Sequence, residues 1–239
     1  MEVTRLFDIL DYRLKHFPNA PVLTAKEEGK WTKHSIEEYI EKANLISYGL
    51  MKMGLERGEK VALISSSRPE WNFLDMGVQQ IGAVMVPIYP TISEDDYRYI
   101  LEHAEVKFIF LEGPELLRKI KNILPDLPNV ENIYTFKKRD ENTSSFGELL
   151  QLGEENKQPE KLQKIKDSIK TTDMTTMIYT SGTTGFPKGV MLTHENLISN
   201  FMAVRNIPNA EFTKCLSYLP LCHIYERMMN YLYQFMGYE

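Results

Sequence analysis

The sequence has little that would suit a secreted, membrane-spanning or nucleic-acid-binding protein. It contains only two cysteines, Cys215 and Cys222, which do not suggest a disulfide scaffold and are typical of a reducing cytoplasm. Acidic residues outnumber basic ones by 33 to 28, for a formal charge of −5, which is not typical of a nucleic-acid binder. No uncharged apolar run reaches the roughly 18 residues of a membrane span. The charged N-terminus, "MEVTRLFDILDYRLKHF", is unlike a signal peptide.

Several common motifs of metal and cofactor sites are also missing. No His-Glu-x-x-His or Cys-x-x-Cys spacing occurs, so the sequence does not predict a metal held by protein side chains alone. The dinucleotide-binding pattern G-x-G-x-x-G is absent. Ser181 lacks the Gly-x-Ser-x-Gly context of a nucleophilic serine. These absences disfavour metalloenzymes, dinucleotide-dependent enzymes and serine hydrolases.

What the sequence does contain is the normal composition of a soluble globular protein. Of its 239 residues, 43% are apolar and 26% are charged, and the length suits one large domain or somewhat more. Apolar spacing predicts a first helix within residues 6–17 and a β-hairpin within 21–34. Ser35 and Glu38 predict a capping box at the start of a second helix, which Gly54 is placed to end.

From Lys60 onward, the chain alternates between strand and helix patterns. Helices are expected after Pro69, after a capping box formed by Ser93 and Asp96, and over residues 114–124. Between them lie four strand-like runs: "KVALIS", "AVMVPIY", "KFIFLE" and "NIYTF". This alternation predicts an α/β fold with a largely parallel sheet flanked by helices.

The stretch from Lys137 to Lys170 is polar and rich in charge. Leu162, Ile165 and Ile169 share one face of a short helix expected there. The four lysines of this helix are more typical of a solvated face than of a phosphate- or membrane-binding patch. The β-rich run "MTTMIYT" follows and leads into a segment of unusual composition.

That segment is "YTSGTTGFPKGVMLTH", residues 179–194. Between Thr180 and Gly189 it has four hydroxyl side chains, three glycines, one proline and one lysine. Glycine permits close backbone approach, and successive N–H groups can form an anion-binding nest. The hydroxyls add donors, and Lys188 adds a positive charge suited to phosphate oxygens. The usual phosphate loop, G-x-x-x-x-G-K-[ST], is not matched, because Pro187 and Gly189 replace the second glycine and the magnesium-binding hydroxyl.

The sequence therefore predicts a polyphosphate-binding loop between two strands. The run "GVML" after the loop is strand-like, and the next helix begins only at Thr193, so no helix dipole points directly into the loop. A magnesium ligand would come from upstream, and Thr180 is the nearest candidate. The alternative is a solvent-exposed hairpin connection rich in Thr and Gly, which suits a lone Gly-Thr pair better than this whole combination.

On these residues, the chain resembles the adenylate-forming superfamily of AMP-binding enzymes, which includes acyl-CoA synthetases. Its signature loop is matched at 180–189, and "GAVMVPIYPTISEDDYRYIL" (82–101) and "LPLCHIYER" (219–227) resemble the long-chain fatty acyl-CoA synthetase branch. Alanine is more usual where Cys222 stands. The resemblance covers nearly the whole chain. It implies that His223 lies beside the substrate carboxylate, that Thr180 lies near Mg²⁺, and that the nucleotide phosphates are bound by Thr180, Ser181, Gly182, Thr183, Thr184, Gly185 and Lys188.

The resemblance also implies a reaction and a domain boundary. In the family, a carboxylate attacks the α-phosphorus of ATP to give acyl-adenylate and pyrophosphate, and coenzyme A then displaces AMP. Residues 1–239 correspond to the first half of the large N-terminal domain, without the adenine-binding Tyr-Gly-x-Thr-Glu motif or the small C-terminal domain with its catalytic lysine. No catalytic residue is expected in this chain, which alone is expected to be inactive. The aromatic run "ERMMNYLYQFMGYE" is expected to leave a large apolar surface bare unless further protein covers it.

Other readings stay open on the sequence. One is an adenylating enzyme that delivers the acyl group to a carrier protein; another, for this chain alone, is a nucleotide-binding module without chemistry. Without the resemblance, His223 would more often be a core residue, and His16, His34, His103 and His194 have no such support. The expected partners are fatty acid, ATP and coenzyme A, with no nucleic acid, in the cytoplasm. Acyl chain length, oligomeric state and peripheral membrane contact are left open.

Overall fold

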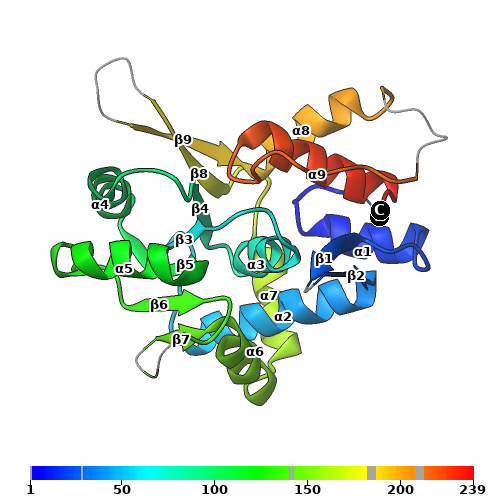
Figure 1. Cartoon of the computed structure of the whole chain (residues 1–239). Coiled ribbons are helices and arrows are strands. Elements are labelled where there is room, and N and C mark those ends of the chain that lie inside the picture. The colour runs from blue at the N-terminus through cyan, green and yellow to red at the C-terminus, as the bar shows by residue number, and fades with distance from the viewer. Residues whose placement is uncertain (1, 28, 140, 142, 182–186, 208–212) are drawn as a thin grey trace.

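The computed structural model describes residues 2–27, 29–139, 141, 143–181, 187–207 and 213–239. In this part of the chain, an open sheet of seven strands lies between two layers of helices (Figure 1). The strand order is β7-β6-β5-β3-β4-β8-β9. Neighbouring strands are parallel, except that β9 runs antiparallel to β8. The predicted fold class, α/β with a largely parallel sheet, is confirmed.

The elements follow the predicted alternation of strands and helices. The strands are β1 (Leu23–Glu27), β2 (Lys30–His34), β3 (Lys60–Ile64), β4 (Val84–Ile88), β5 (Val106–Leu111), β6 (Asn132–Thr135), β7 (Ser144–Ser145), β8 (Met174–Thr180) and β9 (Lys188–Thr193). The helices are α1 (Asp8–His16), α2 (Ile36–Lys52), α3 (Pro69–Gln80), α4 (Glu94–His103), α5 (Gly113–Ile123), α6 (Phe146–Glu155), α7 (Pro159–Ser168), α8 (His194–Val204) and α9 (Ile224–Met236), with a 3-10 turn η1 (Leu124–Asp126). The strands β1 and β2 form the predicted hairpin, separate from the large sheet.

Each face of the sheet is covered by its own apolar core. Successive strand residues point to opposite faces, so Val61 packs in one core and Ala62 in the other. The first core contains buried residues of α2, α3 and α9, whereas the second contains those of α4 and α5. Figure 1 shows α4 and α5 on one side of the strands and α2 and α3 on the other. Because both faces are buried, strands such as "KVALI" are nearly continuous apolar runs.

The predicted helix caps form, with one difference. Ser93 and Asp96 make the expected capping box at the start of α4, and Gly54 follows α2 with a φ of 79°. At the start of α2, Ser35 Oγ accepts a hydrogen bond from the Glu38 N–H at 3.2 Å. The Glu38 carboxylate, however, lies 3.0 Å from His34 Nδ1. The predicted box at Ser35 is therefore only half formed, because the preceding histidine takes the carboxylate.

The charge-rich stretch before β8 holds more structure than the sequence predicted. The helix expected around Leu162 is α7, but α6 was not expected. A full capping box of Ser145 and Glu148 starts α6, and the helix packs closely on α2. At Gly153 of α6, an added Cβ would lie 1.9 Å from the Leu45 backbone oxygen. This approach requires glycine, so the helix pair depends on a tertiary contact that periodicity alone does not reveal.

The aromatic C-terminal segment packs within the chain. Helix α9 contacts α1 and α8, and Met228, Tyr231 and Leu232 are buried in the first core. The Phe235 ring stacks on Tyr12 with centroids 4.6 Å apart. No large apolar side chain in residues 226–239 is exposed. The prediction of a bare apolar surface over this segment is wrong, because the amphipathic helix turns its apolar side chains onto α1 and α8.

A buried histidine attaches the N-terminal segment to α8. The Leu6 N–H donates to His194 Nδ1 at 3.2 Å, and the Phe7 ring meets the imidazole edge-on at 5.6 Å between centroids. His194 is 1% exposed, and burial lowers the pKa of its imidazole to about 4. The side chain is therefore neutral in the folded protein at neutral pH. No helix in the described ranges combines the length and apolar composition needed to cross a bilayer.

Acidification should weaken the fold through His194. An unfolded histidine has a pKa of about 6.5, so from there down to a folded pKa of about 4 the unfolded chain binds a proton that the folded chain does not. Stability therefore falls as the pH falls through this window, by about 3 kcal/mol in total. His194→Asn keeps an acceptor for the Leu6 N–H and should lose less stability on acidification. Urea titrations at both ends of the window test this, and an equal loss in both proteins would contradict it.

Candidate functional site

The candidate site lies at the edge of the sheet where parallel strands end. Met85 of β4 is in register with Val61 of β3 and with Thr176 of β8, so the carboxyl ends of these three strands meet at one edge. Past that level, β4 continues three residues to Ile88 and β8 four residues to Thr180. Ligands of open α/β sheets bind outside the carboxyl ends of the strands. The predicted loop therefore begins where this fold class binds its ligands.

The strands β8 and β9 form the hairpin that carries the predicted loop. Thr180 and Lys188 are register partners across the hairpin, and side chains of directly opposed residues lie on the same face. Both are exposed, as is Ser181. Within the described part of the chain, Lys188 forms no ion pair. Gly182, Thr183, Thr184 and Gly185 lie outside the described residues. The strand–loop–strand context, with the next helix capped by Thr193, is confirmed.

A tyrosine at the start of the motif fixes the base of this hairpin. The Tyr179 hydroxyl lies 2.6 Å from His103 Nδ1, and the two rings meet edge-on at 5.7 Å. Partial burial raises the pKa of Tyr179 to about 12, so its hydroxyl stays protonated at neutral pH. This contact joins the end of α4 to β8. No role for His103 was predicted from the sequence, because its partner lies 76 residues away.

His223 is at the N-terminus of α9. Its Nδ1 accepts a hydrogen bond from the Tyr225 N–H at 3.3 Å, and its side chain is exposed. The preceding turn is fixed to the end of β3, because Ser67 Oγ donates to the Leu219 carbonyl at 3.1 Å and accepts from the Leu221 N–H at 3.3 Å. His223 thus approaches the same edge of the sheet as the loop. Its exposure contradicts the alternative that it is a core residue.

The cysteine beside this histidine is not a nucleophile at neutral pH. Both cysteines are free, as predicted. Cys222 is 2% exposed, and burial raises the pKa of its thiol to about 11. A thiolate is the reactive form of cysteine, and almost none is present at neutral pH with such a pKa.

Two charged residues that follow His223 hold α9 in place. The Glu226 carboxylate accepts a hydrogen bond from Ser217 Oγ at 2.6 Å. The Arg227 guanidinium is completely buried and lies 2.5 Å from the Asp75 carboxylate of α3. Burial alone would lower the pKa of Arg227, but Asp75 more than offsets this and the pKa is raised. The Arg227–Asp75 pair was not predicted from the sequence, although two adjacent charges inside an aromatic run were a signal.

Arg227 also binds two hydroxyl groups. Its Nε donates to the Tyr231 hydroxyl at 2.8 Å, and its Nη1 donates to Thr176 Oγ1 at 2.6 Å. The Tyr231 hydroxyl donates in turn to the second oxygen of Asp75 at 2.5 Å. This buried network joins α3, α9 and β8. It lies four residues before Thr180 on β8 and four residues after His223 on α9.

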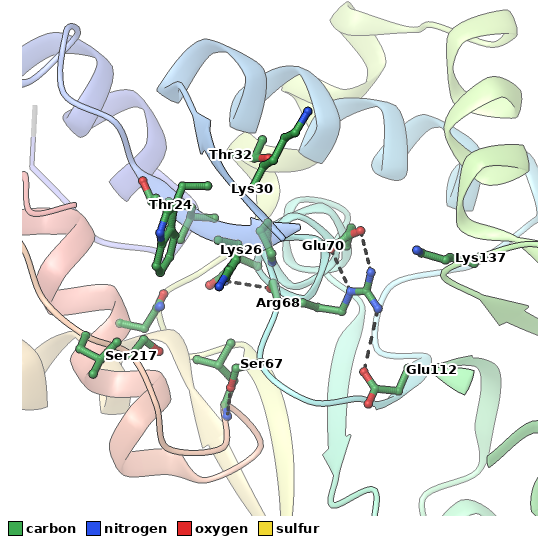
Figure 2. A pocket seen from close by; sticks show the side chains of 18 residues that line it. Thr24, Lys26, Lys30, Thr32, Ser67, Arg68, Glu70, Glu112, Lys137 and Ser217 are labelled. Carbon is green, nitrogen blue, oxygen red and sulfur yellow. Dashed lines mark hydrogen bonds and ion pairs between the residues drawn. The ribbon is translucent and has the colours of Figure 1, made fainter. Parts of the chain in front are cut away.

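A pocket of about 980 Å³ opens at the same edge, between the ends of β3 and β5 (Figure 2). The helices that follow these two strands, α3 and α5, cover opposite faces of the sheet, so this is the topological switch point. Figure 2 shows Arg68 between two carboxylates: Glu70 at 2.8 Å and Glu112 at 3.9 Å. None of the predicted site residues with a described position lines this pocket. The arginine of this pocket is paired with carboxylates, and Lys26, Lys30 and Lys137 also line it.

Comparison with known proteins identifies the family to which the chain belongs. Residues 10–237 match the model of the AMP-binding enzyme family, so the chain belongs to that family. Long-chain-fatty-acid–CoA ligase ACSBG2 of Xenopus laevis is 33% identical over 217 residues, which cover 87% of this chain and 29% of that protein. Long-chain-fatty-acid–CoA ligase FadD15 of Mycobacterium bovis is 30% identical over 206 residues, which cover 85% of this chain and 34% of that protein. The chain thus spans roughly a third of the length of these relatives.

A solved structure agrees with the fold. The N-terminal domain of FACL13 from Mycobacterium tuberculosis aligns with 98% of this chain and 56% of its own, with a TM-score of 0.81 and 22% identity. At that identity the likeness concerns the fold alone. The alignment covers nearly the whole α/β fold described above.

The two thiols should differ in reactivity. Cys222 is almost fully buried and has a pKa of about 11, whereas Cys215 is half-buried and its pKa is raised less strongly. At neutral pH, iodoacetamide should therefore alkylate Cys215 at least about tenfold faster than Cys222. Mass spectrometry of Cys215→Ser and Cys222→Ala, each with one thiol, measures both rates. Equal rates would show that the turn before His223 opens readily.

Proposed function

We propose that this chain is part of an ATP-dependent long-chain fatty acid–CoA ligase. Such an enzyme joins a fatty acid to AMP with release of pyrophosphate, and then transfers the acyl group to coenzyme A. The observation that carries the proposal is the hydroxyl–glycine–lysine loop, held between β8 and β9 at the carboxyl edge of the sheet. Membership of the AMP-binding family and relatives named as long-chain-fatty-acid–CoA ligases support the same substrate class.

The proposed role of the loop is to hold the β- and γ-phosphates of ATP and the departing pyrophosphate. Its donors are the hydroxyls of Thr180, Ser181, Thr183 and Thr184, the backbone N–H groups at Gly182 and Gly185, and the ammonium group of Lys188. The shared face of Thr180 and Lys188 and the absence of an ion pair to Lys188 in the described ranges support this role. A lysine without a protein carboxylate partner can give its three N–H donors to phosphate oxygens.

The same edge fits Mg²⁺ only together with the nucleotide. Thr180 offers one neutral oxygen, and Mg²⁺ prefers six oxygen ligands, most of them from phosphates and water. We therefore propose that Thr180 assists a Mg²⁺ ion that arrives with ATP. When bound, the ion neutralises charge on the phosphates. The hydroxyl of Thr180 would orient that complex at the end of β8.

His223 is proposed to bind the carboxylate of the fatty acid. Its Nδ1 accepts from the Tyr225 N–H, which fixes the ring orientation, and its Nε2 has no hydrogen-bond partner among the residues that the structure describes. An exposed apolar ring lies close to His223 in sequence, because Tyr225 is 54% exposed. Coenzyme A is the proposed acyl acceptor, and the free, unpaired thiols agree with a cytoplasmic enzyme.

The proposal is tested with the protein expressed from the full reading frame that contains residues 1–239. Incubation with ATP, Mg²⁺ and palmitate should release pyrophosphate, and addition of coenzyme A should give palmitoyl-CoA, detected by mass spectrometry. Adenylate without the coenzyme A thioester, but with transfer to a carrier protein, would favour the carrier-protein alternative. Nucleotide binding with no fatty-acid-dependent release of pyrophosphate would leave only a nucleotide-binding module.

In that protein, Lys188→Ala should weaken the use of ATP. Loss of one charged phosphate contact costs about 1.5–3 kcal/mol, or roughly ten- to a hundredfold in kcat/KM for ATP. Lys164→Ala removes an exposed lysine of α7 and should change nothing. If the two variants behave alike in ATP-dependent kinetics, Lys188 does not belong to the site.

His223→Ala should impair the use of fatty acid more than the binding of ATP. The imidazole would contact the carboxylate and not the phosphates, so KM for palmitate should rise or kcat should fall, while the Kd for ATP changes little. Kinetics at varied palmitate, together with calorimetric ATP binding, separate the two effects. Weaker ATP binding with normal palmitate kinetics would refute the assignment.

A further inference from the structure

The two proposed halves of the site are carried by different elements, and one buried hydrogen bond joins them. The phosphate loop begins at the end of β8, and His223 begins α9. Arg227, four residues after His223, donates through Nη1 to Oγ1 of Thr176 at 2.6 Å. Thr176 lies four residues before Thr180 on β8. Each proposed half of the site is therefore connected by four residues to the same Arg227–Thr176 hydrogen bond.

The segments from Thr176 to Thr180 and from Arg227 to His223 are short. The hydrogen bond between Arg227 and Thr176 can therefore set the distance between Thr180 and His223. Four residues of a strand span about 13 Å, and four residues of a helix span about 6 Å. Thr176 does not act on β8 alone, because its hydroxyl also donates to the Met85 carbonyl of β4 at 2.7 Å. Arg227 is thus tied to the central strands of the sheet. Both side chains are fully buried.

The other contacts of Arg227 fix the position of its guanidinium group. Asp75 holds Nη2 at 2.5 Å, the Tyr231 hydroxyl accepts from Nε, and the guanidinium lies 5.3 Å from the ring centroid of Trp71. The Gln79 side-chain amide donates to the Tyr231 hydroxyl at 3.3 Å. A buried charge with these partners cannot shift without losing several bonds at once. A shift of α9 relative to β8 would break the network.

We propose that Thr176, acting through Arg227, is a positioning residue that fixes the distance between the acid-binding and the phosphate-binding halves of the site. This inference rests on the proposed function. In the first step, a carboxylate oxygen bonds to the α-phosphorus as the bond from that phosphorus to pyrophosphate breaks. The reacting atoms must approach to about 3–3.5 Å. Each half can bind its own ligand without the contact, but their joint alignment depends on it.

The chain offers a matched control for the test. Thr176→Val removes the hydroxyl and keeps the shape of the side chain. The adjacent Thr175 is 1% exposed, and its hydroxyl has no hydrogen-bond partner among the described residues, so Thr175→Val removes a hydroxyl of β8 outside the network. Thr176→Ser keeps the hydroxyl and should restore wild-type behaviour.

The first readout is hydrogen exchange and needs no activity. In Thr176→Val, backbone amides of residues 226–230 should exchange about tenfold faster relative to those of β3 and β5, which report global unfolding. Thr175→Val and Thr176→Ser should show no such selective change. Unchanged exchange in α9 of Thr176→Val would overturn the proposed link, whatever the protein catalyses.

The second readout is the rate of acyl-adenylate formation in the full-length protein, measured per active site. In Thr176→Val, kcat should fall roughly ten- to a hundredfold, while the separately measured Kd values for ATP and palmitate stay within about twofold of wild type. Thr175→Val and Thr176→Ser should retain the wild-type kcat. A wild-type protein that releases no pyrophosphate with fatty acid refutes the proposed function and leaves the exchange result to decide the link. An active wild type with an unchanged kcat in Thr176→Val refutes the positioning role alone.

Discussion

A buried arginine is the constraint on which the candidate site depends. Taking a guanidinium and a carboxylate out of water costs several kcal/mol per ion and is repaid only when partners satisfy both groups. Here Arg227 is fully buried with Asp75, and the hydroxyls of Tyr231 and Thr176 complete its bonds. Those partners come from α3, α9 and β8, so the three elements must dock together for the charge to be stable. The docking of α9, which begins after His223, against β8 follows from that requirement.

The carboxyl edge of the sheet then determines which groups meet. The parallel strands β3, β4 and β8 end there within one residue of one another, with β8 the longest. The turn before His223 reaches the same edge because Ser67, just after β3, holds it by two hydrogen bonds. Among the described residues, β8 and β9 pair directly and the next helix starts only after Thr193. If the connection binds phosphate as proposed, its donors are the hydroxyls and Lys188, in place of the helix N-terminus that follows the usual phosphate loop.

Much of the fold was predictable because its signals are local. The runs that became β3 to β5 are nearly continuous apolar segments, as expected for strands buried on both faces, and Ser93 with Asp96 marked the start of α4. The predictions failed where a contact with a distant part of the chain, and not the local sequence, determined the structure. Glu38 pairs with His34 instead of completing its capping box, and α6 rests on a contact between Gly153 and α2. The apolar face of α9 looked bare in sequence because the residues of α1 and α8 that cover it lie far away along the chain.

By itself, the sequence determined the chemical type of the loop and the alternation of strands and helices. Residues 180–189 combine glycines, hydroxyls and one lysine within ten residues, the clearest signal in the chain, and this composition predicts a phosphate-binding loop. Only the tertiary structure determined which charged side chains are buried and which helices and strands they connect. Arg227 lies 51 residues from Thr176 and 152 from Asp75. Apolar periodicity does not specify such pairs, because a charged side chain can face water as readily as a partner until the helices dock.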